Sequence, residues 1–532
     1  MSKTWLTNFD AENQDFWENQ GGENIAWKTL WITTGALTFS FATWFIMSVL
    51  VVKLNGIGFK FTSDQLFWLA AMPGLSGGIF RIINTFLLPI YGTRHIVSFT
   101  TFLKILPCVG IGFAVMDTST PFWIFMILAF LTGIGGGDFS SYMPSTNLFF
   151  PRRLKGTALG LQAGIGNFGV SLVQFITPIL IGVGVVGTSS QFTNIDAKEV
   201  EEMFIQLGEE QVTQSFMLLD KETQILLMNK FDQEKAKMTF HENIPSEPID
   251  FFVGLPVSLQ AKSFTYIHPK KAEAILTSFQ TGKNGVKNST IYLQNSAFWF
   301  IPFLIIIGIV SWISLRSIPM KASFKEQLDI FGDKHTWYCT LVYLMTFGGF
   351  AGLSAAFPML IKSVYGGFPD APDPLMFAFY GPLIGSASRV LFGFAADRFG
   401  GGVLTTISGI GLTVGTILLV SMGLLTPNSL DQFPMFVGIM LSLFFFTGIG
   451  NASTFRQFPI IFQHNPRQAA GVIGWTAGVA AFGPFIFSML ILLSMNVSGN
   501  SNAFFIGLII FSVIATFVNW NFYHKKGCVR PS

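Results

Sequence analysis

The sequence predicts an all-α membrane protein with twelve transmembrane helices in two pseudo-symmetric six-helix bundles. Three observations lead to this prediction: an apolar composition, twelve long apolar segments, and motifs that recur in the two halves. Of the 532 residues, 50% are hydrophobic and only 11% are charged. This charged fraction is less than half of that in a typical soluble domain, so most of the chain must face lipid or other apolar helices.

Each apolar segment is long enough to cross about 30 Å of hydrocarbon as a helix. Two series of six segments are separated by a polar stretch. The first series is 29–52, 64–90, 96–116, 120–149, 157–185 and 294–315, and the second is 336–363, 374–396, 402–425, 433–462, 469–495 and 502–523.

These spans divide the chain into seven parts. They are a cytoplasmic N-terminal segment (1–28), helices 1–5 (29–185), an extracytoplasmic insert (186–293), helix 6 (294–316), a central cytoplasmic loop (317–335), helices 7–12 (336–523) and a cytoplasmic tail (524–532). The first segment is acidic and precedes any long apolar run, so a cleaved signal peptide is not expected. Three cysteines without paired spacing predict neither a disulfide framework nor a metal site, and no cofactor is expected.

Basic residues in the short loops predict the orientation, because loops rich in Lys and Arg stay in the cytoplasm. Counted from a cytoplasmic N-terminus, the loops on that side carry Arg94, Arg152, Arg153, Lys155, Arg316, Lys321, Lys325, Lys334, Arg398, Arg467, Lys525, Lys526 and Arg530, whereas the opposite short loops carry only Lys53, Lys60 and Lys362. Both termini are therefore expected in the cytoplasm. A net charge of +3 is too small to indicate a nucleic-acid surface.

The polar insert, 186–293, falls on the outer side by parity. Amphipathic stretches at 197–207, 221–238 and 269–279 predict short helices and a small folded cap. Three roles stay open for it: control of access, binding of a partner, or an insertion that the loop merely tolerates, since loop length costs little entropy.

Internal repeats relate the two halves. Gly77-x-x-x-Arg81 in the second span recurs as Gly385-x-x-x-Arg389 in the eighth, and Thr-Gly-Ile-Gly at 132–135 recurs at 447–450. A third motif, Ala-Gly-Ile-Gly-Asn-Phe-Gly at 163–169, has a counterpart at 477–483. Parallel six-helix repeats with a substrate site between them are typical of major facilitator transporters, which move one half against the other.

Arg81 and Arg389 occupy equivalent positions well inside their spans. An arginine in a membrane helix costs about 2.5–3.5 kcal/mol on insertion scales, so it needs an anion, a partner or a cavity. No carboxylate stands one helical turn from either residue, and an anionic substrate is the favoured partner. The alternative is that each guanidinium bonds backbone carbonyls or a distant acid.

Glycines of the repeated motif allow two interpretations. They either permit close helix crossings or bring peptide groups within reach of a small anion. The residues concerned are Gly164, Gly166, Gly169, Gly478 and Gly483.

Asp397-Arg398 follows the eighth span in a Gly-Phe-Ala-Ala-Asp-Arg-Phe-Gly-Gly loop. This loop resembles the loop motif of the major facilitator superfamily. The resemblance implies a gating role, in which the acid and the base hold the cytoplasmic ends of helices together.

Longer motifs in both halves resemble the bacterial nitrate/nitrite porter family of the NarK type. They are Phe-Ser-Ser at 139–141, Phe-Phe-Pro-Arg at 149–152, the segment 160–171, Tyr-Leu-Met-Thr-Phe-Gly at 343–348, and the segment 381–389. The resemblance implies that Arg81 and Arg389 bind the anion, that Phe139 and Phe347 sandwich its plane, that Tyr343 donates a hydrogen bond, and that Asn167 completes the site.

Two residues depart from that family's pattern. Asp138 replaces a neutral amide, and Lys104 replaces an aliphatic residue in the third span. Asp138 could relay a proton, form a hydrogen bond beside the site, or pair with Lys104. Lys104 could instead extend its ammonium group to the membrane surface.

The sequence and the resemblance together predict exchange of nitrate for nitrite by a monomer in the lipid of the inner membrane. Two cations without a titratable base would make the empty site costly to carry, which favours exchange. Proton-coupled nitrate symport is the alternative, supported only by Asp138. An enzyme is not expected, because the histidines form no ligand cluster. A non-transporting anion sensor is the other alternative.

Overall fold

The computed structural model describes residues 4–228, 248–279, 281–319, 325–368 and 370–532. The remaining residues lie within the predicted N-terminal segment, the insert, the central loop and the loop before the eighth span. Lys321 and the part of the predicted helix 221–238 beyond residue 228 therefore lie outside the described residues.

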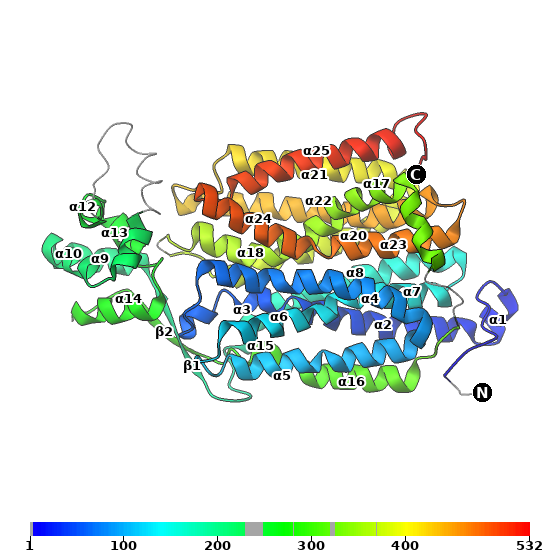
Figure 1. Cartoon of the computed structure of the whole chain (residues 1–532), viewed down its shortest axis with the longest axis horizontal. Coiled ribbons are helices and arrows are strands. Elements are labelled where there is room, and N and C mark those ends of the chain that lie inside the picture. The colour runs from blue at the N-terminus through cyan, green and yellow to red at the C-terminus, as the bar shows by residue number, and fades with distance from the viewer. Residues whose placement is uncertain (1–3, 229–247, 280, 320–324, 369) are drawn as a thin grey trace.

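Two bundles of long helices lie side by side (Figure 1). Both termini lie at one end of the bundles, which we call the terminus end, and the insert extends from the other, the insert end. The first half comprises α1 (Gln14–Asn19), α2 (Gly22–Trp44), α3 (Ile46–Leu50), η1 (Leu54–Ile57), α4 (Ser63–Leu103), α5 (Ile105–Ala114), α6 (Phe122–Gly137), α7 (Phe139–Phe149), α8 (Arg152–Leu180), α15 (Asn295–Phe298) and α16 (Phe300–Ser314).

The second half follows the central loop. It comprises η3 (Lys325–Gly332), α17 (Lys334–Tyr343), η4 (Leu344–Gly348), α18 (Gly349–Tyr365), α19 (Pro374–Ala378), α20 (Tyr380–Phe399), α21 (Gly401–Ser421), η5 (Leu430–Gln432), α22 (Phe433–Ile461), α23 (Pro466–Ala480), α24 (Gly483–Ser498), α25 (Asn502–Asn519) and η6 (Trp520–His524).

Eleven helical segments of the described chain are long and apolar enough to cross a membrane. The first predicted span, 29–52, corresponds to α2 and α3 and is not among them, because α2 carries six Thr and Ser residues. Five of these hydroxyls donate hydrogen bonds to carbonyls one turn earlier in the helix. The helix also contacts α4, α6, α8 and α16. Five of its six hydroxyls are thus satisfied within the helix itself, and the Thr34 hydroxyl has no partner among the described residues.

Several helices are interrupted. The predicted second span and the beginning of the third lie in α4, which is broken at Gly92, where φ is +73°, and the third span continues in α5. Asp138 separates α6 from α7, and the π-helical turn η4 separates α17 from α18. Phe139 is the first residue of α7, directly after the break at Asp138, and Phe347 lies in the π-helical turn η4.

The insert forms a small α+β unit with a hydrophobic core of its own. Strand β1 (Ser190–Ile195) pairs antiparallel with β2 (Val286–Ile291), a sheet that the all-α prediction did not include. The described helices of the insert are α9 (Ala197–Leu207), α10 (Glu209–Met217), α12 (Pro248–Val253), α13 (Val257–Ser263) and α14 (Pro269–Leu276), followed by η2 (Thr277–Phe279).

Polar contacts join the two halves at the insert end. The Lys53 ammonium lies 2.6 Å from the Asp373 carboxylate. Lys362 donates to the carbonyl of Val52 at 2.7 Å. Gln174 on α8 adds a hydrogen bond of 3.0 Å to a carbonyl of α18. These contacts hold the insert end closed in this conformation.

Gly169 marks the closest crossing of α2 and α8. A Cβ at this position would overlap the carbonyl oxygen of Thr38 and lie 2.9 Å from the amide nitrogen of Ala42. Both are backbone atoms of α2, so neither can move aside without shifting the helix. The helix crossing therefore requires glycine at residue 169.

We predict that Gly169→Ala destabilises the protein by about 1–3 kcal/mol, the usual cost of overpacking. The measurement is the midpoint of thermal unfolding of the purified protein in detergent. Gly160→Ala is the matched control, because it lies on the same helix with open space around it. Equal midpoints for the two variants would contradict the prediction.

Candidate functional site

Arg81 and Arg389 lie near each other, one in each half. Arg81 on α4 is fully buried, and Arg389 on α20 is 4% exposed. Their charges repel each other, and the Tyr343 hydroxyl lies close to both. Within the described residues, no carboxylate is paired with either guanidinium group.

Backbone carbonyls satisfy only part of this pair. Arg81 donates from Nε to Gly136 at 2.8 Å and from Nη1 to Ala477 at 2.7 Å. Its Nη2 has no hydrogen-bond partner among the described residues, and neither do Nη1 and Nη2 of Arg389. Backbone carbonyls, the alternative partners considered from the sequence, therefore bind two nitrogens of Arg81. Three guanidinium nitrogens of Arg81 and Arg389 have no partner among the described residues.

Aromatic rings enclose the Arg81 guanidinium. Its Cζ lies 4.7 Å from the ring centroid of Phe139 and 4.8 Å from that of Phe347. Phe41 and Trp44 on α2 complete the enclosure at 5.9 and 5.4 Å. Such contacts stabilise a desolvated cation.

Phe139 and Phe347 also stack on each other, with centroids 6.1 Å apart and planes 28° from parallel. A planar anion held between them would need two van der Waals contacts, or about 7–8 Å. The rings must therefore separate before they can form the predicted sandwich. Since one ring comes from each half, movement of the halves controls their spacing.

Tyr343 and Asn167 are both buried with free polar groups. Tyr343 stacks on Phe347 at 5.5 Å, and its hydroxyl lies near the Arg389 guanidinium without completing a hydrogen bond in this conformation. Both amide atoms of Asn167 on α8 also have no partner among the described residues. Unpartnered buried donors are uncommon because each costs about 1–3 kcal/mol.

The sequence reasoning missed other aromatic and polar residues here. Phe455 on α22 lies 5.0 Å from the Arg389 guanidinium, and Phe41 and Trp44 contact Arg81. Asn451 on α22 is fully buried with both amide atoms unpartnered in the described structure. The repeat Thr-Gly-Ile-Gly ends at the residue before Asn451, so an amide directly after a repeated motif was the available signal.

The motif glycines lie at close helix crossings. Gly166 packs against Leu37, Gly169 against Thr38, and Gly483 against Gly348. The remaining two lie beside the arginines. Gly164 packs on Val390, next to Arg389, and Gly478 faces Ile82 and the Cβ of Arg81.

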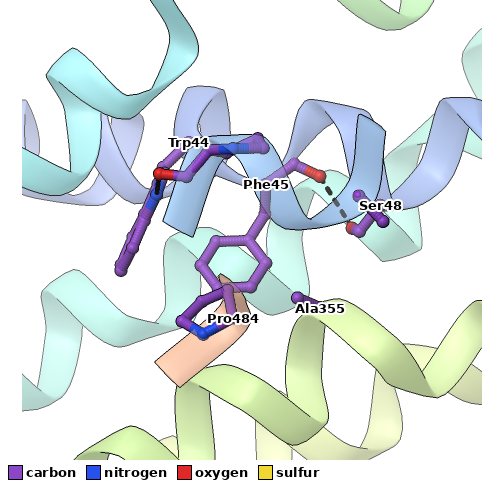
Figure 2. Close-up of a pocket in the computed structure, with 7 residues that line it drawn as sticks. Trp44, Phe45, Ser48, Ala355 and Pro484 are labelled. Atoms are coloured by element: carbon purple, nitrogen blue, oxygen red, sulfur yellow. Dashed lines mark hydrogen bonds between the residues drawn. The ribbon is translucent and has the colours of Figure 1, made fainter. Parts of the chain in front are cut away.

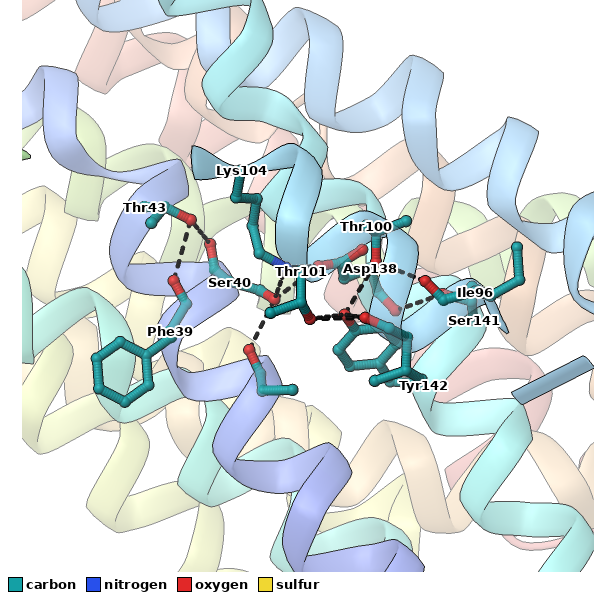
Figure 3. A network of polar contacts seen from close by, with 12 residues as sticks. Phe39, Ser40, Thr43, Ile96, Thr100, Thr101, Lys104, Asp138, Ser141 and Tyr142 are labelled. Carbon is teal, nitrogen blue, oxygen red and sulfur yellow. Dashed lines mark hydrogen bonds and ion pairs between the residues drawn. The ribbon is translucent and has the colours of Figure 1, made fainter. Parts of the chain in front are cut away.

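Asp138 forms a buried ion pair with Lys104 (Figure 3). The Ser40 hydroxyl lies 2.6 Å from the carboxylate and 2.8 Å from the ammonium group. Both charged side chains are fully buried, so the alternative in which Lys104 reaches the membrane surface is wrong. The Lys104 ammonium group is paired with a carboxylate inside the bundle. Of the three roles considered for Asp138, the structure shows the pairing with Lys104.

Asp397 and Arg398 lie at the terminus end of α20. Arg456 on α22 donates to Asp397 at 2.7 Å, and the Arg398 guanidinium lies 5.6 Å from the ring centroid of Phe399. The acid therefore links α20 to α22 within the second half. At 67% exposure of the Asp397 side chain, such a pair contributes about 0–1 kcal/mol.

A small cavity of about 10 Å³ lies between the halves, lined by residues of both (Figure 2). It has room for about one water molecule and not for a larger anion. Trp44 is held there by a hydrogen bond to the Pro73 carbonyl at 2.7 Å. The lining residues are Trp44, Phe45, Ser48, Ala70, Pro73, Ala355 and Pro484.

Solved structures with the same architecture are transporters. The chain superposes on the major facilitator transporter FucP in its outward conformation, with a TM-score of 0.53 and 12% identity over 92% of this chain and 97% of that one. A bacterial homolog of the human lysosomal transporter Spinster gives a TM-score of 0.53 and 13% identity over 92% and 95%. At these identities the likeness shows the fold alone.

Curated relatives cover nearly the whole chain. A probable nitrate/nitrite antiporter, NarK2 of Thermus thermophilus, is 46% identical over 99% of this chain and 98% of its own length. The nitrate/nitrite transporter NarU of Escherichia coli is 30% identical over 99% and 97%. No protein-family model matches the chain. The two halves, the apolar helices and these relatives show that this multi-pass membrane protein is a transporter, not an enzyme, and belongs to the nitrate/nitrite porter family of the major facilitator superfamily.

Proposed function

We propose that this transporter exchanges nitrate for nitrite, with the anion held between Arg81 and Arg389. The observation that supports this most directly is the pair of buried guanidinium groups that lie near each other, one from each half, without a paired carboxylate among the described residues. The relatives named as nitrate/nitrite transporters support the choice of anion.

The chemistry of the site suits a small planar anion. A guanidinium is a planar fork of donors that matches two oxygens at once. Tyr343 and Asn167 offer further donors, and aromatic walls lower the local dielectric and strengthen each charged contact. Larger tetrahedral anions would fit poorly between Phe139 and Phe347.

Exchange follows from the charge of the site. Without an anion, the two arginines repel each other in a buried environment, so passage of the empty site through the closed state is costly. A bound anion in each direction removes this cost. Asp138 does not supply a free base, because Lys104 neutralises it, and this pairing argues against proton-coupled symport.

The remaining features of the proposal concern membrane and assembly. Transport by alternating access needs only one chain, so we infer a monomer in the lipid of the inner membrane. Both termini lie at the terminus end. The loops rich in Lys and Arg are expected on the same side as the termini, so we place the terminus end in the cytoplasm. The insert then faces the outside.

We expect labelled nitrate to enter proteoliposomes preloaded with nitrite and not empty vesicles at equal pH. Arg81→Lys and Arg389→Lys should each lower the initial rate at subsaturating nitrate roughly tenfold to a hundredfold, the range for losing one charged hydrogen bond. Lysine keeps the charge and removes the planar fork. Uptake into empty vesicles driven by a proton gradient would instead establish symport.

The Lys104–Asp138 pair gives a second test of the coupling. Asp138→Asn alone leaves Lys104 buried without its counterion, which costs about 3–5 kcal/mol. The double variant Lys104→Met with Asp138→Asn removes both charges, and we expect it to fold and to exchange nitrate with an unchanged pH profile. A double variant that is folded but has lost the pH dependence of the original protein would favour symport through Asp138.

A further inference from the structure

We propose that Asn451 on α22 is a further anion-binding residue, which donates from its side-chain amide to the same substrate as Arg389. This inference rests on the proposed function and adds a residue that neither the repeats nor the family resemblance identified. Asn451 is fully buried, and its Oδ1 and Nδ2 both have no hydrogen-bond partner among the described residues.

The face of α22 that carries Asn451 is the face that meets Arg389. Residues three and four apart lie on one face of a helix. Three positions before Asn451, Gly448 packs directly on α20 at Ser388, beside Arg389. Four positions after it, the ring of Phe455 lies 5.0 Å from the Arg389 guanidinium. Asn451 thus lies between two residues that contact α20 at this arginine.

Other buried polar residues of α22 have partners. The Thr454 hydroxyl donates to Gly450 within the helix, and Gln457 bonds the amide of Asn519 on α25. Asn519 itself donates to the Gly402 carbonyl and the Thr406 hydroxyl. Since the fold satisfies these neighbours, the amide group of Asn451, with both of its polar atoms free, is available for a ligand.

Asn451 also gives the second half a counterpart to Asn167. Each asparagine is fully buried and unpartnered within the described structure, and they come from α8 and α22 on opposite halves. An anion with three oxygens would then meet a guanidinium and an amide from each half. This arrangement explains how two halves can share one small ligand.

The test compares Asn451→Ala and the isosteric Asn451→Asp with Thr454→Val as the matched control. In nitrite-loaded proteoliposomes, we expect KM for nitrate to rise about tenfold in Asn451→Ala, the lower range for a hydrogen bond to a charged ligand. Asn451→Asp should raise KM further, because a carboxylate repels the anion. Thr454→Val should keep KM within twofold.

A second readout separates binding from folding. The unfolding midpoint of the ligand-free variants should stay near that of the original protein, while the rise in midpoint caused by added nitrate should shrink for both Asn451 variants. Unchanged KM and an unchanged nitrate-induced rise in either variant would overturn the role of Asn451. If the original protein neither exchanges nitrate nor is stabilised by it, the proposed function itself fails.

The insert contacts both halves of the protein. From these contacts we infer that the insert is a latch, which must release the second half before the insert end can open. The insert joins α8 to α15, and both of these helices belong to the first half. It is also docked there: His268 lies 2.6 Å from the Phe59 carbonyl, and Phe192 packs against Gly56.

The insert also touches the loop between α18 and α19 in the second half. Lys198 lies 3.7 Å from Asp370, and the Lys262 ammonium lies 4.7 Å from the ring centroid of Phe368. Because the insert is fixed to the first half at both of its ends, these contacts must break when the two halves separate at this end. Lys53 reinforces the same junction, since it contacts Phe192 of the insert and Asp373 of the second half.

The test cross-links Lys198→Cys with Asp370→Cys by a short bifunctional thiol reagent. Both side chains are accessible, at 56% and 68% exposure. We expect the cross-link to reduce nitrate exchange at least tenfold, whereas the same variant without reagent exchanges nitrate normally. The matched control is Lys271→Cys with Asp220→Cys, an ion pair within the insert, whose cross-link should leave exchange unchanged.

Full exchange by protein with a completed Lys198–Asp370 cross-link would overturn the latch. Loss of exchange in the cross-linked control would overturn it as well, because rigidity of the insert alone would then explain the effect. Exchange before treatment reports on the proposed function, so the two ideas fail separately.

Discussion

The structure depends on two buried positive charges that the protein itself does not neutralise. Arg81 and Arg389 lie on opposite halves, close enough for their charges to repel each other, and three of their terminal nitrogens lack a partner among the described residues. Lys104, also buried, shows the contrasting solution, because Asp138 pairs with its charge and Ser40 accepts a hydrogen bond from it within the first half. A cation with a built-in counterion belongs to the scaffold, while a pair without one requires an anion from outside.

Irregular backbone places the groups around this pair. Phe139 begins α7 directly after the break at Asp138, the π-helical turn η4 carries Phe347, and both rings contact Arg81. Close crossings at Gly169 and Gly483 bring the neighbouring backbones together. Arg81 also donates to the carbonyl of Ala477 in the other half, so the substrate site is at the same time a contact between the halves.

The observed conformation is closed at the insert end and compact at the centre. The stacked rings of Phe139 and Phe347 leave less than the space that a planar anion needs between them, and the nearby cavity has room for about one water molecule. Lys53 and Lys362 hold the two halves together farther out, and the insert rests on loops of both. Opening therefore requires polar contacts to break at the insert end and aromatic contacts to separate at the centre.

The sequence by itself determined the membrane class, the two-half organisation and the two arginines, because apolar length, repeated motifs and an isolated charge in a membrane helix each have a local physical meaning. It also indicated Asp138 and Lys104 as unusual, and it left their pairing open, since spacing along the chain does not say which face of one helix meets another. Only the tertiary structure decided that pairing, the enclosure of Arg81 by Phe41 and Trp44, and the contact of Phe455 with Arg389. Sixty phenylalanines look alike in the sequence, and packing across helices distant in the chain selects the few that face a charge.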